Sequence, residues 1–565
     1  MKQCPQCRRT YADETLNFCL DDGEWLRAAA EEEPVTAVLN PGDLPSEEET
    51  RHFAGTNNAV RPSDPAPARA TPKAASRRRL YFRAALVAVV IAAAFFGFRF
   101  IPYGGGRHIE SIAVMPFTNE SGNADVEYLS DGMTETLINS LSQIPNLSVK
   151  SRSSVFRYKG NNNDLKTVAS ELSVQAFLTG RIVQRGDRLA LNVELIDART
   201  ENTIWGNRYE RRISELVALQ NEITRDVSGR LKTDLTGQEQ ARIAKNYTAN
   251  AEAYQLYLKG RFFYSTFSES GFRNGIDLFQ QAIAIDPNYA LAYSGLADCY
   301  FGLSDQFEPP RDVLPKMRVA AEKAVALDPS LAEAHASLGL VKMYQDRDWI
   351  GAETEFRQAI SLNPTYAPAH FFYARMLSWL ERHDEAVAAG ERAVQLDRFS
   401  STANANLGYL LMLAGRFDEA LAHLEKTLQM EPNSTIAHSY LGMTYLRLDQ
   451  FDKAVAASEK AAQLTKSGRY LGGLGYAYAA AGQRENALRV LEEMRQLKNK
   501  QHVSSFYIAA VYSGLGDKDK AFQYLEDAFA EGSDPLPSIR VNVFFDELRS
   551  DPRFAALLKR LNMAF

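Results

Sequence analysis

The chain has 565 residues, of which 45% are hydrophobic and 24% are charged, a composition that is ordinary for folded domains. The formal net charge of -6 gives no general attraction to nucleic acid, and four cysteines are too few for a disulfide-stapled secreted scaffold. We therefore expect a mostly globular chain of several domains.

Three of the cysteines lie within the stretch CPQCRRTYADETLNFCLDDG at the start of the chain. Cys4 and Cys7 form one C-x2-C pair, and Cys19 with Asp22 has the spacing of a second pair. Two such pairs supply the four tetrahedral ligands that Zn2+ prefers. The stretch resembles the zinc-ribbon modules at the start of many bacterial membrane proteins, although Asp22 replaces the usual last cysteine. We predict a Zn2+ site within residues 1–27; the alternative is a degenerate ribbon that binds no metal.

Residues 28–79 are rich in Ala, Glu, Pro and Thr, which predicts a disordered linker. The run that follows is uncharged and mostly apolar between Arg83 and Arg99. Taken as a helix over residues 80–103, it would span about 36 Å, enough for the roughly 30 Å hydrocarbon core of a bilayer. Both arginines lie near its ends, where their long side chains can snorkel. We predict a transmembrane helix; a buried core helix and a cleaved signal sequence are the alternatives.

Basic residues are distributed unequally about this run. Six precede it and two follow it: Arg69, Lys73, Arg77, Arg78, Arg79 and Arg83, against Arg99 and Arg107. The excess of Lys and Arg on one side predicts that the N-terminus is cytoplasmic. We therefore expect a single-pass protein of the bacterial inner membrane, with its C-terminal domains in the periplasm.

Strand and helix patterns alternate over residues 108–240. Ile109–Phe117 is β-branched and apolar, as in a buried strand, and Val126–Ile144 has apolar residues at helical spacing. The stretch VQAFLTGRIVQRGDRLALNVELIDARTENTIWGNRYERR predicts strands joined by the turns QRGDR and ARTEN, before a closing helix that begins at Ile213. Shorter strand and helix signals occupy Leu147–Ser151 and Leu165–Leu172. This order predicts an α/β domain.

Several pieces of this region carry a family resemblance. IAVMPFTNESG, EYLSDGMTETLINSLSQIPNLSVKSRSSVF, LTGRIVQRGDRLALNVELIDA and IWGNRYER resemble the TolB amino-terminal-like domain of bacterial membrane proteins. In those proteins the cytoplasmic end is often a kinase, a nucleotide cyclase or a DNA-binding domain, whereas here it holds only the ribbon. The sequence contains no Gly-Lys dipeptide and no HRD or DFG triplet. The resemblance therefore implies an architecture and no activity.

A fixed period governs the chain from about residue 251. One ladder recurs every 34 residues and comprises Ala352, Ala386, Ala420 and Ala454; a second comprises Gly339, Ala374, Gly408 and Gly442. Small residues at fixed positions let paired helices approach closely, and this period is that of the tetratricopeptide (TPR) repeat. We predict an all-α TPR solenoid of about eight repeats over residues 251–535, with capping helices in 536–565.

The first helix of each TPR repeat lines the concave side of the solenoid. Counted from the second ladder, aromatic and apolar residues occupy the positions that face this groove: Tyr344, Phe371, Trp379, Tyr409, Met443 and Tyr476. Lys and Asn, which clamp a terminal carboxylate in this family, are largely missing there. We predict a groove that holds an extended or helical peptide; the alternative is that these residues are core between helices.

Histidines also follow the repeat period, at His335, His370 and His438, with Asn404 in the intervening slot. Neighbouring repeats are about 10 Å apart, too far for one metal ion to bridge. We therefore expect packed, hydrogen-bonded histidines. Cys299 lies in a repeat helix and is expected to be a buried, small apolar residue.

These features predict a membrane-anchored scaffold whose α/β domain and solenoid bind a protein or peptide partner. The alternative is a signalling receptor that relays partner binding across the membrane to the ribbon. A third hypothesis is an enzyme in the α/β domain, where SDGMTE and Asn161–Asn163 are the polar clusters. We assign no catalytic residue and expect no enzyme, no nucleic-acid partner and no small-molecule substrate. Zn2+ is the cofactor that we expect.

Overall fold

The computed structural model describes residues 109–160, 164–231, 236–237, 245 and 247–563, and the backbone of 2–3, 10–11 and 27–28. The chain divides into two compact units, Met1–Pro102 and Tyr103–Phe565. The four predicted Zn2+ ligands and the predicted membrane span over residues 80–103 lie outside the described residues. Within the described part of the chain, every helix is too short or too polar to cross a membrane.

Three two-residue strands are described in the first unit. They are β1 (Lys2–Gln3), β2 (Thr10–Tyr11) and β3 (Arg27–Ala28). β1 pairs antiparallel with both others, so the strand order is β2-β1-β3.

The second unit begins with a six-stranded sheet. Its strands are β4 (Ser111–Val114), β5 (Thr118–Asn119), β6 (Ser148–Val149), β7 (Ala176–Arg185), β8 (Arg188–Asp197) and β9 (Thr203–Arg212). The order is β6-β4-β7-β8-β9, with β5 also paired to β7. β4 runs parallel to β6 and β7, whereas β7, β8 and β9 form an antiparallel meander. The predicted small α/β domain is thereby present.

Burial along the strands explains this arrangement. Ile112, Ala113 and Val114 of β4 are all fully buried, as expected for a parallel strand that is covered on both faces. In β8, buried apolar residues from Leu189 to Leu195 alternate with half-exposed residues, as expected when only one face is covered. The short strand β5 falls in TNESGN, directly after the predicted strand Ile109–Phe117.

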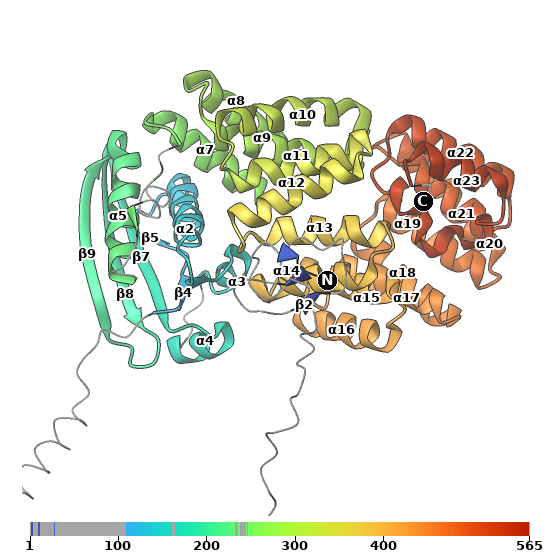
Figure 1. The fold of residues 1–565 in the computed structure, drawn as a ribbon, viewed down its shortest axis with the longest axis horizontal. Helices are drawn as coiled ribbons and strands as arrows, with labels where there is room; N and C mark the ends of the chain where they lie inside the picture. Colours follow the sequence, from blue (N-terminus) through green and yellow to red (C-terminus); the bar gives the residue numbers. More distant parts are fainter. Residues whose placement is uncertain are drawn as a thin grey trace, which may run out of the picture. The chain divides into compact units, whose positions relative to one another are not determined.

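Helices cover this sheet (Figure 1). They are α2 (Glu127–Leu141), α3 (Arg152–Phe156), α4 (Leu165–Leu172) and α5 (Leu216–Leu231), with the short 3-10 helices η1 (Ala124–Val126) and η2 (Ile213–Glu215) before α2 and α5. α2 contacts β4 and β5, and α5 contacts β9. The helix α3 was not predicted from the sequence. Its N-cap is Ser151, whose side chain accepts a hydrogen bond from the backbone amide of Ser154.

Eight helical pairs follow, and we call the first helix of each pair an A helix and the second a B helix. The A helices are α7 (Ala251–Tyr264), α9 (Ala290–Leu303), α11 (Ala332–Val341), α13 (Ala367–Trp379), α15 (Ser401–Leu413), α17 (Thr435–Arg447), α19 (Gly468–Ala480) and α21 (Ser505–Gly514). The B helices are α8 (Glu269–Ile285), α10 (Pro310–Leu327), α12 (Trp349–Leu362), α14 (His383–Leu396), α16 (Phe417–Met430), α18 (Phe451–Leu464), α20 (Arg484–Lys498) and α22 (Lys518–Glu531). The predicted solenoid of paired helices is confirmed.

The glycine ladder of the sequence lies where A and B helices of one pair meet. A Cβ atom on Gly339 would come within 2.8 Å of the Phe356 ring, and one on Gly408 would come within 2.5 Å of Leu424. These side chains belong to the B helix of the same pair. Glycine at these A-helix positions is therefore required by close helix packing.

The periodic histidines and Asn404 hold the loops between pairs. His335, His370 and His438 each donate a hydrogen bond from Nε2 to the carbonyl six residues earlier, at 2.9, 3.0 and 3.1 Å. Asn404 Nδ2 donates the equivalent bond, 2.9 Å long, to the Arg398 carbonyl. The predicted hydrogen-bonded histidines are confirmed. Cys299 is fully buried, as predicted.

His370→Ala should lower the free energy of unfolding by about 1–3 kcal/mol, because it removes a buried side chain together with its hydrogen bond to the Pro364 carbonyl. His370→Asn is the matched control, since Asn404 makes the same contact in the next pair. In urea unfolding followed by circular dichroism, His370→Asn should lose less than half of the unfolding free energy that His370→Ala loses. Equal losses in the two variants would contradict a loop-holding role.

Candidate partner-binding groove

The A helices are more deeply buried than the B helices, which bears directly on the predicted groove. Nine of the thirteen residues of α15 are buried, against three of fourteen in α16. A B helix packs on one side of an A helix only, so other parts of the chain must cover its inner side. The predicted groove residues lie on that inner side.

Four of the six predicted groove residues are buried and two are half-buried. Tyr344, in η3 (Lys342–Asp346) just after α11, and Trp379 on α13 are each 4% exposed, and their rings meet edge to face at 5.7 Å. Tyr409 on α15 and Met443 on α17 are each 7% exposed. The half-buried residues are Phe371 on α13 and Tyr476 on α19.

Arg375 connects three neighbouring pairs on this face. Its guanidinium lies 4.8 Å from the centre of the Phe371 ring and donates to Tyr344 Oη at 3.3 Å and Asn406 Oδ1 at 3.4 Å. The next rings along the face, Tyr409 and Tyr440, stack at 4.6 Å. Arg375 is not among the predicted groove residues, although it follows Ala374 by one residue, as Tyr409 follows Gly408.

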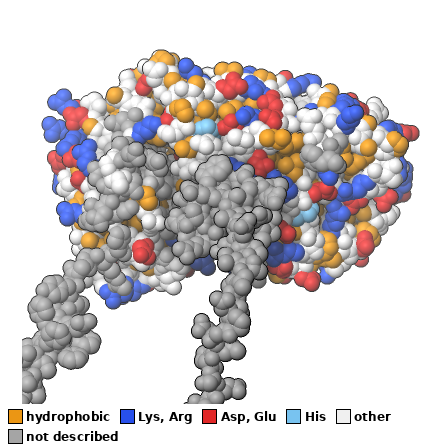
Figure 2. All heavy atoms as spheres, in the orientation of Figure 1, with side chains coloured by type: hydrophobic (Ala, Val, Ile, Leu, Met, Phe, Trp, Pro, Cys, Tyr) orange, Lys and Arg blue, Asp and Glu red, His pale blue; other side chains and the backbone are white. Residues whose placement is uncertain are grey.

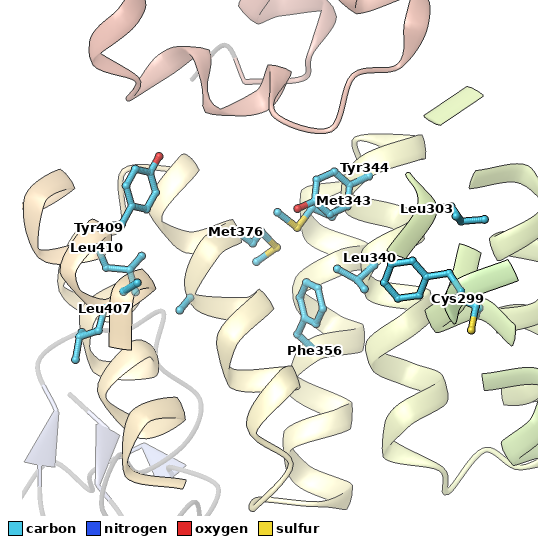
Figure 3. Close-up of a cluster of buried hydrophobic side chains, with 14 of the residues drawn as sticks. Cys299, Leu303, Leu340, Met343, Tyr344, Phe356, Met376, Leu407, Tyr409 and Leu410 are labelled. Carbon is cyan, nitrogen blue, oxygen red and sulfur yellow. The ribbon is translucent and has the colours of Figure 1, made fainter. Parts of the chain in front are cut away.

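The chain's own end covers part of this inner face. The covering part is residues 533–548, which we call the C-terminal segment. This segment contains η4 (Leu536–Arg540) and η5 (Val543–Leu548). η4 contacts α13, and η5 contacts α17 and α21. Figure 3 shows the faint red ribbon of the C-terminal region passing beyond Tyr344 and Tyr409, on the side toward which the Tyr409 hydroxyl points.

Groove side chains bind both the main chain and the side chains of the C-terminal segment. Arg447 donates to the Val541 carbonyl at 2.8 Å and also pairs with the Asp546 carboxylate. Tyr476 donates from its hydroxyl to the Val543 carbonyl at 3.1 Å, and its ring lies 4.9 Å from that of Phe544. Burial raises the pKa of Tyr476 to about 12, so this donor keeps its proton at neutral pH.

Residues 536–565 are predicted to cap the last repeat. α23 (Pro552–Arg560) contacts this pair, since its Arg553 and Arg560 pair with Asp519 and Glu526 of α22, and η4 and η5 contact α22 and α21. The residues before α23 also reach the inner face, because their apolar side chains need burial. Phe545, for example, is fully buried and packs at 5.0 Å on Phe506 of α21.

The end of the chain also contacts the third helical pair. Trp349 Nε1, at the start of α12, donates to the Leu561 carbonyl at 3.1 Å. The Arg347 guanidinium lies 4.4 Å from the centre of the Phe529 ring of α22. The solenoid therefore returns on itself, with its last pair tied to its third.

A hollow of about 220 Å³ opens beside the C-terminal segment, at the turns within the fourth and fifth pairs. Three arginines line it, Arg447, Arg540 and Arg549. Asp546 pairs with Arg447 and Arg549, and Glu381 pairs with Arg540. The hollow has room for a side chain of a bound peptide, in a site where the charges are already largely balanced.

The α/β domain contacts the first and fourth pairs through polar and charged side chains. Glu135 of α2 accepts two hydrogen bonds from Arg261 of α7, at 2.9 and 2.7 Å, and Arg261 also binds Asp298 of α9 at 3.1 Å. Burial raises the pKa of Asp298 to about 6, although the Arg261 charge opposes this shift. Further along, Ser151 Oγ donates to Asp397 at 2.9 Å in the loop before α15.

Of the two polar clusters considered for an enzyme, the structure describes one. SDGMTE forms the buried start of α2, where Asp131 pairs with Lys159 and Glu135 binds Arg261. Asn161–Asn163 lie outside the described residues. Within the described ranges, no group of three or more His, Cys, Asp or Glu side chains could hold a metal ion.

Family models match both the repeats and the α/β domain. Residues 343–401 and 411–469 match tetratricopeptide-repeat family models, so the chain contains TPR repeats. Residues 108–226 match the family model described as HilA/YgeH-like transcriptional regulator, second domain. The resemblance to the TolB amino-terminal-like domain stays a prediction.

Two curated relatives cover parts of the chain. "Putative adenylate cyclase 3" of Rhizobium meliloti is 30% identical over 285 residues, 49% of this chain and 41% of that protein. The transcriptional regulator HilA of Salmonella typhimurium is 24% identical over 147 residues, 26% of each chain. The chain thus covers less than half the length of these relatives. Among solved structures, the TPR protein YrrB is 24% identical, with a TM-score of 0.25, over 33% of this chain and 92% of its own.

Single alanine variants at Phe371 and Tyr409 should separate groove residues from core residues. Tyr409→Ala should cost about 3–5 kcal/mol of unfolding free energy, because it empties a buried site and removes the stack on Tyr440. Phe371→Ala should cost less than half as much, because Phe371 is only half-buried. Thermal and urea unfolding measure both; equal losses would show that Phe371 is also core.

Proposed function

We propose that the chain is a membrane-anchored protein-interaction scaffold, in which the TPR solenoid and the α/β domain bind a protein or peptide partner. The observation that carries this proposal is that the inner face already holds a peptide segment, through Arg447 on the Val541 carbonyl and Tyr476 on the Val543 carbonyl. Contacts to main-chain carbonyls do not depend on side-chain identity, so the same donors suit an extended segment of another polypeptide.

Membrane anchoring is part of this proposal and is supported by the sequence. The apolar run over residues 80–103 and the excess of basic residues before it favour a single span, with a cytoplasmic N-terminus and periplasmic C-terminal domains. The donor set Cys4, Cys7, Cys19 and Asp22 fits a tetrahedral Zn2+ site on the cytoplasmic side.

We propose no enzymatic activity, no small-molecule substrate and no nucleic-acid partner for the chain. The titratable groups of the SDGMTE cluster, Asp131 and Glu135, pair with Lys159 and Arg261. On the described part of the face seen in Figure 2, basic and acidic side chains are interspersed. A mixed surface of this kind favours protein contacts over the phosphate backbone of nucleic acid.

The contact between the α/β domain and the solenoid favours a second candidate, a signalling receptor that passes partner binding to the ribbon. Glu135, Arg261 and Asp298 connect three elements, α2, α7 and α9, and Asp397 ties the α/β domain to the fourth pair as well. A partner that changed the spacing of the helical pairs would therefore strain this contact. The names of the cyclase and HilA relatives are compatible with a signalling role.

The scaffold proposal predicts that partner capture requires the solenoid. We expect cross-linking and affinity purification from membranes to recover a polypeptide partner with the full chain, and to lose it when residues 251–565 are removed. Phe371→Ala in the full chain is the matched control, because it alters the groove and keeps the solenoid folded. Purification of this variant should recover less of the same partner. Equal recovery with and without the solenoid would contradict the proposal.

The topology proposal predicts opposite sides for the two ends of the chain. In inverted inner-membrane vesicles, added protease should remove residues before the span and leave residues 104–565 intact until detergent is added. The cytoplasmic face is outward in such vesicles, so digestion of both ends without detergent would show that ribbon and solenoid share one side.

A further inference from the structure

Two Ser-Asp dipeptides, 229 residues apart, bind each other across the solenoid. Ser304 Oγ donates to Asp534 Oδ1 at 3.1 Å, and Ser533 Oγ donates to Asp305 Oδ1 at 3.0 Å. Ser304 and Asp305 follow the A helix of the second pair, whereas Ser533 and Asp534 begin the C-terminal segment. We call these four residues the Ser-Asp clasp. It joins the segment that covers the inner face to the early part of the solenoid.

The clasp brings two carboxyl groups together with little solvent. Asp305 keeps 11% of its side-chain surface exposed, and Asp534 is also partly buried. Burial and the nearby charge of Asp305 hold the pKa of Asp534 well above its ordinary range, against the opposing effects of the Ser304 hydrogen bond and Arg375. Two neighbouring carboxylates with little access to water repel each other, so the closed clasp favours the protonated form of Asp534.

The other titratable and charged groups around the clasp come from four elements. His502, before α21, has Nε2 at 3.9 Å from Asp305 Oδ1 and makes no hydrogen bond through that atom. Three other groups interact electrostatically with Asp305 or Asp534. They are Tyr344 of η3, Arg375 of α13 and Tyr507 of α21. Both tyrosines have pKa values raised by burial, so they are neutral. Arg375 is thus the one fixed charge among these groups.

We propose that the Ser-Asp clasp is a proton-dependent latch, which holds the C-terminal segment on the inner face of the solenoid while Asp534 is protonated and releases it when Asp534 ionises. Given the proposed function, release would free Arg447 and Tyr476 for a partner's main chain. The latch would then regulate access to the groove.

The direction of the pH dependence follows from the raised pKa of Asp534. A carboxyl group whose pKa is higher in the closed state than in the open state binds its proton more tightly when closed. The contribution of the clasp to closure is therefore complete below the ordinary carboxyl pKa of 3.8 and is lost as pH rises through the raised value. The segment should be most firmly held in acid and least firmly held in alkali.

Hydrogen exchange of the full chain in detergent tests the latch directly. Protection factors for the amides of residues 536–548 are measured from pH 5 to pH 9, each against the intrinsic exchange rate at the same pH. For a single linked proton, protection in the wild type should fall with rising pH by up to about tenfold per pH unit. Asp534→Asn should remove this slope, because the amide stays neutral and can still accept from Ser304.

Two further variants keep the test decisive. Asp305→Asn should move the fall in protection to lower pH, because it removes the charge that raises the pKa of Asp534 and leaves its burial in place; this covers the case in which Asp534→Asn does not fold. Asp546→Asn is the matched control on the same segment: it should lower protection at every pH, through loss of the Arg447 pair, and keep the wild-type slope. A flat wild-type profile, or a wild-type pH profile in both clasp variants, would overturn the latch. No partner enters this experiment, so its outcome is independent of partner capture.

Discussion

The structure depends on one constraint, which is that the A helices of the solenoid must be covered on their inner side. Their sequences are apolar or aromatic around most of the helix, as the nine buried residues of α15 show, and a B helix covers only one side. The C-terminal segment supplies the missing cover over the fourth, sixth and eighth pairs. It does so with apolar side chains, and with carbonyls that Arg447 and Tyr476 satisfy.

The α/β domain supplies cover at the other end of the solenoid. There α2 packs on α7, and Arg261 lies between Glu135 and Asp298. Buried ion pairs of this kind contribute little net stability but are costly to break, so they favour one docking geometry over others. The inner face is therefore shared between two parts of the same chain, and a partner that binds there must displace one of them or extend its surface.

Local pattern predicted most of the elements, because each is encoded over a short stretch. The 34-residue ladders locate the helical pairs, and Gly339 and Gly408 have the close contacts that such ladders indicate. The sequence could not predict that residues 533–548 occupy the groove, because these residues follow no repeat period. Their contacts are with residues distant in sequence, as in the pair Arg447–Asp546. Arg375 differs in type from the aromatic and apolar residues at the equivalent positions, such as Tyr409 and Met443, so the sequence pattern favours Phe371, one turn earlier.

The central claim is that Tyr476 faces the C-terminal segment of its own chain. Replacing Tyr476 by a photoreactive benzoylphenylalanine in the full chain, followed by irradiation and peptide mapping, measures this directly. The structure predicts an intrachain adduct to residues 541–546. Adducts confined to other polypeptides, or an adduct elsewhere in the chain, would contradict it and would leave the inner face open.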